Sequence, residues 1–220
     1  MTDSEHPQPP GLGSLHSSSG TIPLSDPQRR DILTHRLKQM QEAEEQELPI
    51  EKSHSRIDRF NLFAKALQSQ GSIYYPGSHT DVSPSAADGF TGRQITYVDP
   101  NPKVIQALQK EGYNAVLADA HTYAPGKVDL LLLLNFYAQE PLSYVVPQGY
   151  VICNKYYQDG SIFSDMFGQK DFEFTGALVK SNNKQIVFDT ADLEKYKQVS
   201  DLTKQEHDEN LFVFRRKEVT

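Results

Sequence analysis

The hydrophobic pattern divides the chain into a polar first part and a longer part in which two kinds of apolar spacing alternate. Short unbroken apolar runs flanked by turn residues are typical of buried strands, whereas apolar residues three and four positions apart indicate helices. The runs predict strands at 72–75, 94–98, 114–117, 128–134, 150–154, 171–179, 185–188 and 211–215. The periodic stretches predict helices at 28–48, 56–69, 83–88, 103–111, 140–146 and 191–197.

Strands and helices that alternate in this way predict an α/β fold with a doubly wound, mostly parallel, Rossmann-like sheet of about seven strands. The leucine-rich run at 128–134 predicts a strand buried on both faces, as in the middle of a parallel sheet. The last strands follow one another with little helix between them, which predicts a hairpin at the end of the sheet.

Helix boundaries follow from capping residues. Pro49 ends the first predicted helix, and Ser55 is the expected N-cap of the next. Ser83 and Pro84 predict the start of a short helix in the first connection between strands. Gly112 has the position expected just after the end of helix 103–111.

Composition predicts three parts. Residues 1–25 are rich in Pro, Ser, Gly and His and are expected to be a disordered tail. Residues 26–55 form a charged, amphipathic helical extension, which could pack on the domain, associate with itself or bind a protein partner; packing on the domain is the first expectation. Residues 56–220 form the α/β domain.

Charge and cysteine content exclude some classes of function. The formal net charge of −7 disfavours binding to nucleic-acid phosphates. The single cysteine, Cys153, excludes a disulfide framework within the chain and a cysteine-based zinc site. No apolar segment is long enough to span a membrane, and the N-terminus has no signal-peptide pattern. We therefore expect a cytoplasmic protein without a structural metal.

Candidate chemistry gathers where the first three strands end. The first strand leads into Tyr75-Pro-Gly-Ser-His-Thr-Asp81, the second ends at Asp99-Pro100, and the third is followed by Asp119-Ala120. The carboxyl ends of parallel strands share one edge of a sheet, where ligands of doubly wound folds bind. Each aspartate also has a simpler interpretation, as a residue that caps a turn.

This order of elements and acids resembles the class I S-adenosylmethionine-dependent methyltransferases over roughly residues 56–217. Members carry a Gly-rich turn after the first strand, an acid at the end of the second, an Asp-Ala pair after the third and a Pro-Gly-Gly-like turn before the fifth. The corresponding residues here are Gly77, Asp99, Asp119-Ala120 and Pro147-Gln148-Gly149. The resemblance also implies an antiparallel C-terminal strand.

The resemblance implies a site for S-adenosylmethionine. Asp99, with Pro100 beside it, would accept hydrogen bonds from the ribose hydroxyls, and Asp119, with Ala120, would accept from the adenine amino group. Gly77 would let the backbone approach the cofactor. The helix beginning at Ser83 would offer free amides to the cofactor carboxylate.

The first turn departs from the family pattern of an acid and three spaced glycines. Tyr75 replaces the acid, and His79 and Asp81 replace the second and third glycines. Either Ser78, His79, Thr80 and Asp81 make a different set of contacts, with Asp81 on the cofactor ammonium, or the pocket has changed and activity is lost. His79 is also a candidate catalytic base.

The segment Asn135-Phe136-Tyr137 follows the fourth strand, where amino-group methyltransferases carry an Asn-Pro-Pro-Tyr-like motif. By that resemblance Asn135 would contact cofactor and acceptor, and the ring of Tyr137 would stack on the acceptor. Both prolines are missing here. The alternative is an ordinary loop at the end of a strand.

Three hypotheses follow. The first is methyl transfer from S-adenosylmethionine to an unidentified acceptor, and the second is an inactive methyltransferase-like module that binds a partner. The third is a nicotinamide-dependent oxidoreductase, since Asp99 also suits that cofactor's ribose; the missing Gly-x-Gly-x-x-Gly motif counts against it.

Overall fold

The structure is a computed structural model that describes residues 48–134, 136, 138–154, 171–181, 183, 185–190 and 210–218. The described residues belong to the compact unit Glu47–Thr220. The strands in the described part of this unit are β1 (Ile73–Pro76), β2 (Ile95–Asp99), β3 (Ala115–Leu117), β4 (Val128–Leu133), β5 (Val145–Asn154), β6 (Phe172–Lys180), β7 (Ile186–Asp189) and β8 (Leu211–Arg216). Its helices within the described residues are α2 (His54–Leu67) and α3 (Pro102–Lys110), with 3-10 turns η1 (Asp88–Phe90) and η2 (Glu140–Tyr144).

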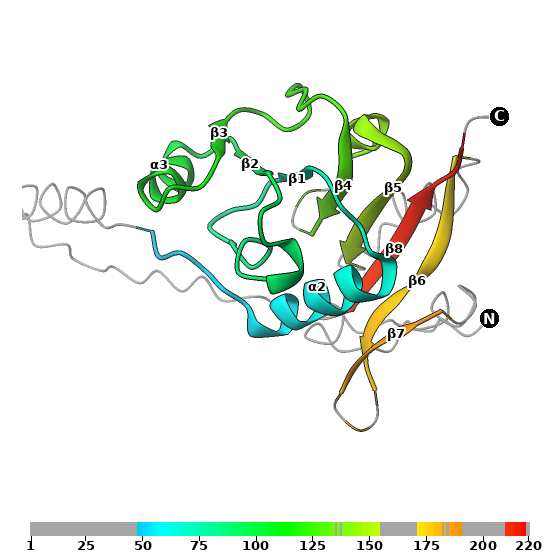
Figure 1. The fold of residues 1–220 in the computed structure, drawn as a ribbon. Helices are drawn as coiled ribbons and strands as arrows, with labels where there is room; N and C mark the ends of the chain where they lie inside the picture. Colours follow the sequence, from blue (N-terminus) through cyan, green and yellow to red (C-terminus); the bar gives the residue numbers. More distant parts are fainter. Residues whose placement is uncertain are drawn as a thin grey trace, which may run out of the picture. The chain divides into compact units, whose positions relative to one another are not determined.

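The described strands form one mixed sheet in the order β3-β2-β1-β4-β5-β8-β6-β7 (Figure 1). The first five are parallel, whereas β8 is antiparallel to both β5 and β6. The chain leaves β1 toward β2 on one side and reaches β4 on the other, so the topological switch point lies between β1 and β4. The predicted α/β, mostly parallel sheet with an antiparallel C-terminal strand is confirmed.

Two apolar layers hold the sheet. Side chains that alternate along the strands face opposite sides, so Leu130 and Leu132 of β4 belong to one core cluster and Leu131 and Leu133 to the other. All four are fully buried, which confirms that this run lies in the middle of the sheet. Cys153 of β5 belongs to the second cluster and is buried.

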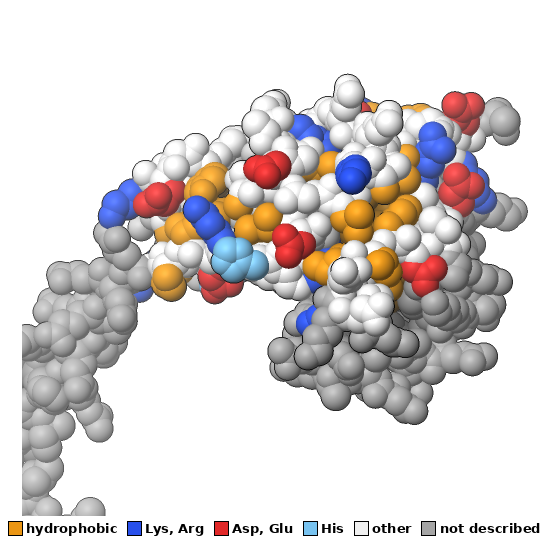
Figure 2. Space-filling model, turned by 60° about the horizontal axis from the view of Figure 1, so that its bottom comes forward, with side chains coloured by type: hydrophobic (Ala, Val, Ile, Leu, Met, Phe, Trp, Pro, Cys, Tyr) orange, Lys and Arg blue, Asp and Glu red, His pale blue; other side chains and the backbone are white. Residues whose placement is uncertain are grey.

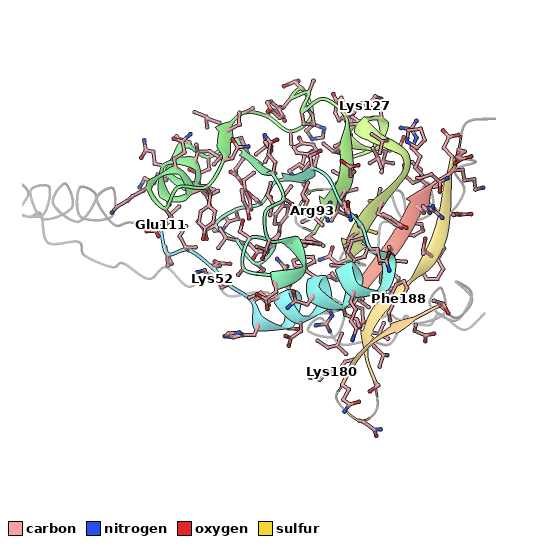
Figure 3. All side chains as sticks on the ribbon, viewed as in Figure 1. Lys52, Arg93, Glu111, Lys127, Lys180 and Phe188 are labelled. Atoms are coloured by element: carbon pink, nitrogen blue, oxygen red, sulfur yellow. The ribbon has the colours of Figure 1, made fainter. Side chains whose placement is uncertain are left out.

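Helix α2 packs on the first face of the sheet through Phe60 and Phe63, which are fully buried. Its N-cap is Ser53, whose hydroxyl accepts from the backbone N–H of Arg56, so the expected cap at Ser55 is wrong by two positions. Phe188 of β7 packs against the same cluster and lies beside α2 (Figure 3). β7, the second strand of the β6–β7 hairpin, therefore packs against α2.

The eight predicted strands are all present, although β5 begins at Val145 rather than at Tyr150. Two predicted helices are wrong. Residues 83–86 form turns followed by η1, and the expected helix at 140–146 is the shorter 3-10 turn η2. The tail 1–25, most of the helical extension 26–55 and the expected helix 191–197 lie outside the described residues.

None of the helices in the described part of the chain has the length and apolar character that crossing a membrane requires. On the face shown in Figure 2, acidic, basic and hydrophobic side chains are intermingled over the described residues. The described residues on this face therefore present no extended basic stripe of the kind that nucleic-acid backbones select.

Candidate functional site at the carboxyl ends of the strands

The first connection, residues 77–94, carries no α-helix between β1 and β2. Gly77 continues the pairing of the two strands, because its N–H donates to the carbonyl of Val98 at 2.7 Å. Gly77 has φ of +59° and His79 has φ of +51°, so both adopt the left-handed region. The family glycine at position 77 is kept, and at position 79 a histidine takes up a conformation that favours glycine.

Asp99 ends β2 beside this turn and is 8% exposed. One carboxylate oxygen accepts from the backbone N–H of His79 at 3.1 Å, and the other accepts from the N–H of Asn101 at 2.9 Å. Asp99 thus caps its own turn, as the simpler interpretation predicts, and it also joins the first turn to the end of β2. A carboxylate has about four lone-pair sites, so each oxygen keeps one acceptor position.

Asp81 is 3% exposed and its carboxylate is surrounded by donors. One oxygen accepts from the Arg56 guanidinium and from the Tyr75 hydroxyl, the latter at 2.9 Å. The other accepts from the backbone N–H of Ser83 at 2.9 Å and from the Ser83 hydroxyl. The four donors fill about four lone-pair sites. Burial raises the pKa of Tyr75 well above its ordinary value, and Asp81 raises it further, so the phenol stays protonated and donates.

Residues 50–53 lie alongside the turn. The N–H of Glu51 donates to the carbonyl of Thr80, and the carbonyl of Glu51 accepts from Val82, each at 2.9 Å. The N–H of Ser53 donates to the Ser83 hydroxyl at 2.8 Å. We call residues 50–53 the strap. It hydrogen-bonds to the turn from the segment that directly precedes α2.

The side chains in the turn face different surroundings. Ser78 and Thr80 are buried, whereas the His79 side chain is 56% exposed and its Nδ1 lies 3.9 Å from the Glu51 carboxylate. The structure therefore brings Tyr75, Gly77, His79, Asp81 and Asp99 together. Sequence reasoning missed Arg56 and the strap, and it placed Ser83 at a helix start rather than on the Asp81 carboxylate.

Asp119 lies on the same edge of the sheet, two residues after β3. Leu117 pairs with Asp99, and the N–H of Ala118 donates to the carbonyl of Asp99 at 3.3 Å. The Asp119 side chain is exposed and accepts from the N–H of His121 at 2.9 Å. Asp119 therefore follows a strand end that is hydrogen-bonded directly to Asp99.

The structure says less about the remaining residues that the sequence predicts for the site. Pro100 is exposed and Ala120 is buried. Asn135 and Tyr137 lie outside the described residues. Phe136, between them, packs its ring against that of His121, with centroids 4.8 Å apart. The described residues contain no group of three or more His, Cys, Asp and Glu side chains that could hold a metal ion.

Comparison with known proteins supports the fold. No protein-family model matches the chain, and no curated protein matches it. Among solved structures, the plantazolicin methyltransferase BpumL in complex with a triazolic desmethylPZN analogue and SAH is 14% identical, with a TM-score of 0.51 over 88% of this chain and 92% of that one. BpumL in complex with SAH is 13% identical, with a TM-score of 0.50 over 89% and 92%.

These likenesses, together with the strand order, define the class: the chain has the class I S-adenosylmethionine-dependent methyltransferase fold. The sheet of about seven strands expected from the sequence has eight in the described part, and its edge strand β7 corresponds to the predicted run at 185–188.

Proposed function

We propose that this protein binds S-adenosylmethionine and transfers its methyl group to an acceptor that is still unidentified. The observation that carries the proposal is the half-occupied carboxylate of Asp99. It stands at the carboxyl end of β2, it is oriented by two backbone amides, and it keeps two acceptor positions. Two ribose hydroxyls need two such positions. The BpumL structures of the same fold contain SAH, the demethylated product.

In this proposal the residues of the site have separate tasks. Asp99 holds the ribose, Asp119 accepts from the adenine amino group, and the backbone around Gly77 and Ser78 adjoins the methionine part. The cofactor supplies an electrophilic methyl group, so the protein's own contribution is mainly to position the acceptor in line with it. Asn135 and Tyr137 are proposed on the acceptor side, at the end of β4.

Calorimetric titration of the full chain with S-adenosylmethionine and with SAH tests the proposal. We expect both to bind, and Asp99→Ala to weaken both by about tenfold or more, because the ribose hydroxyls lose their charged acceptor. Glu111→Gln is the matched control, because Glu111 is an exposed acid just past the end of α3. Thermal unfolding of each variant shows that it is folded during the titration.

A second candidate, an inactive module of the same fold, is favoured by the first connection, which lacks a helix and is held by the strap. Absence of binding of either ligand up to about 1 mM would contradict the enzyme proposal and favour the module. NADH serves as the third ligand. Binding of NADH in place of S-adenosylmethionine would support the oxidoreductase hypothesis.

A further inference from the structure

The two buried aspartates of the site differ in how their acceptor positions are used. Asp99 has one donor on each carboxylate oxygen, and Asp81 has two on each. With about four lone-pair sites on a carboxylate, Asp81 has no position left for the ammonium of a ligand. The sequence-based role of Asp81 as a direct cofactor contact therefore has no free acceptor to support it.

The donors to Asp81 come from three separate parts of the chain. Arg56 belongs to α2, Tyr75 to β1, and Ser83 to the connection itself. The Asp81 N–H donates to the carbonyl of Ser78 at 3.2 Å, which closes the turn around His79. Asp81 is thus the residue through which α2, β1 and the connection itself fix the backbone of the turn.

The turn needs this support because His79 adopts φ of +51°, which is unfavourable for a residue with a side chain. In that conformation its N–H points at Asp99 and donates to the carboxylate. A turn free to relax would let His79 return to an ordinary conformation. Asp99 would then lose one of the two amides that orient it.

We propose that Asp81, held by Arg56, Tyr75 and Ser83, is a positioning residue: it touches no ligand but fixes the turn whose His79 amide orients Asp99. The network replaces the crossover helix that the sequence predicts after Ser83 and that the structure does not contain. This inference rests on the proposed function only in its consequence for ligand affinity. Its structural part concerns the turn alone.

The test uses the full chain with Asp81→Asn and Tyr75→Phe. Asn has the same shape but places an NH2 group against a donor, and Phe removes one hydroxyl while keeping the ring. The control is Asp88→Asn, because Asp88 is an exposed acid in the same connection. The measurements are the Kd for SAH by calorimetry and residue-resolved amide hydrogen exchange of residues 77–83, both under conditions where circular dichroism shows a folded protein.

We expect Asp81→Asn to weaken SAH binding by about tenfold and to speed exchange of the His79 amide by a similar factor, while amides of α3 exchange as before. Tyr75→Phe should change SAH affinity and the exchange rate of the His79 amide in the same direction, but by less. If Asp81→Asn does not fold, Tyr75→Phe alone tests the positioning role of Asp81. Asp88→Asn changes neither.

Two outcomes overturn the inference: a folded Asp81→Asn variant whose His79 amide exchanges at the original rate, or one with faster exchange but unchanged SAH affinity. If the unaltered chain itself does not bind SAH, the proposed function fails instead. Hydrogen exchange then still shows whether Asp81 fixes the turn.

Discussion

The first and second connections between strands, residues 77–94 and 100–114, each link two parallel strands, but they are held in place by different interactions. The second uses α3, which is capped by Asn101, begins at Pro102 and buries Val104, Ile105 and Leu108. The first has no α-helix and is held by a buried polar cluster around Asp81. Apolar periodicity stabilises one connection, and charge-assisted hydrogen bonds between distant residues stabilise the other.

The comparison teaches that a ligand-binding edge can be built without a complete set of crossover helices. A helix positions its neighbours through many contacts between apolar atoms, each of them weak but large when summed over a buried side chain. A buried carboxylate with four donors positions them through few strong contacts, and removing one leaves a charge poorly satisfied. The two connections should therefore respond differently to substitution.

The largest effect is expected in the second connection. Leu108→Ala removes a fully buried side chain from α3 and should lower the free energy of unfolding by about 3 kcal/mol, because a cavity remains. Denaturant unfolding measures the loss, with Gln106→Ala on the exposed face of α3 as control. Hydrogen exchange at residues 77–83 should be unchanged at low denaturant. Faster exchange there would show that the connections are not independent.

Arg56→Met should cost about 2–3 kcal/mol, because it leaves the buried Asp81 charge without its cation while Tyr75 and Ser83 still donate to it. The same denaturant experiment measures it, with Lys65→Met as control because Lys65 is an exposed cation of the same helix. Here exchange at residues 77–83 should accelerate. A cost no larger than that of Lys65→Met would contradict the claim that the polar cluster around Asp81 stabilises the first connection.

Asn101→Ala should cost about 1 kcal/mol, because the side chain of Asn101 caps α3 by accepting from the N–H of Lys103 at 3.0 Å. The cost is measured by thermal unfolding against Asn114→Ala. Asn114 is likewise exposed, and its side chain donates to the Thr96 hydroxyl rather than capping a helix. Equal costs would mean that the cap contributes nothing particular to the second connection.

The smallest effect is expected at His79, where substitution distinguishes the contribution of the backbone conformation from that of the imidazole side chain. His79→Gly should stabilise the fold by about 0.5–1 kcal/mol, since glycine adopts positive φ freely and the exposed contact with Glu51 is worth little. His79→Val should destabilise it, because a β-branched residue resists that conformation. Denaturant unfolding of the two variants gives the sign. Destabilisation by glycine would show that the imidazole itself holds the turn.

The fold could be predicted from sequence because its signals are local. The run of leucines at 130–133 predicts a buried strand. The spacing of Val104, Ile105 and Leu108 predicts one face of a helix. Asp99 and Asp119 could be found because each lies at or within two residues of the end of a recognisable strand. Each of these inferences needed only neighbouring residues.

The first connection could not be predicted because its signals are distant. Ser83 and Pro84 suit a helix start, yet the Ser83 hydroxyl and N–H are committed to Asp81. Arg56 lies 25 positions before its partner, and no local pattern joins them. The left-handed conformation of His79 is likewise set by tertiary contacts rather than by residue type.

Cys153 has a practical consequence. It is the sole thiol of the chain, it is buried, and burial raises its pKa, so in the native state it should resist alkylating and disulfide reagents. A reagent that reacts with it reports that β5 has separated from its neighbours. The rate at which such a reagent modifies Cys153, followed by mass spectrometry, therefore measures global opening of the fold without an engineered cysteine.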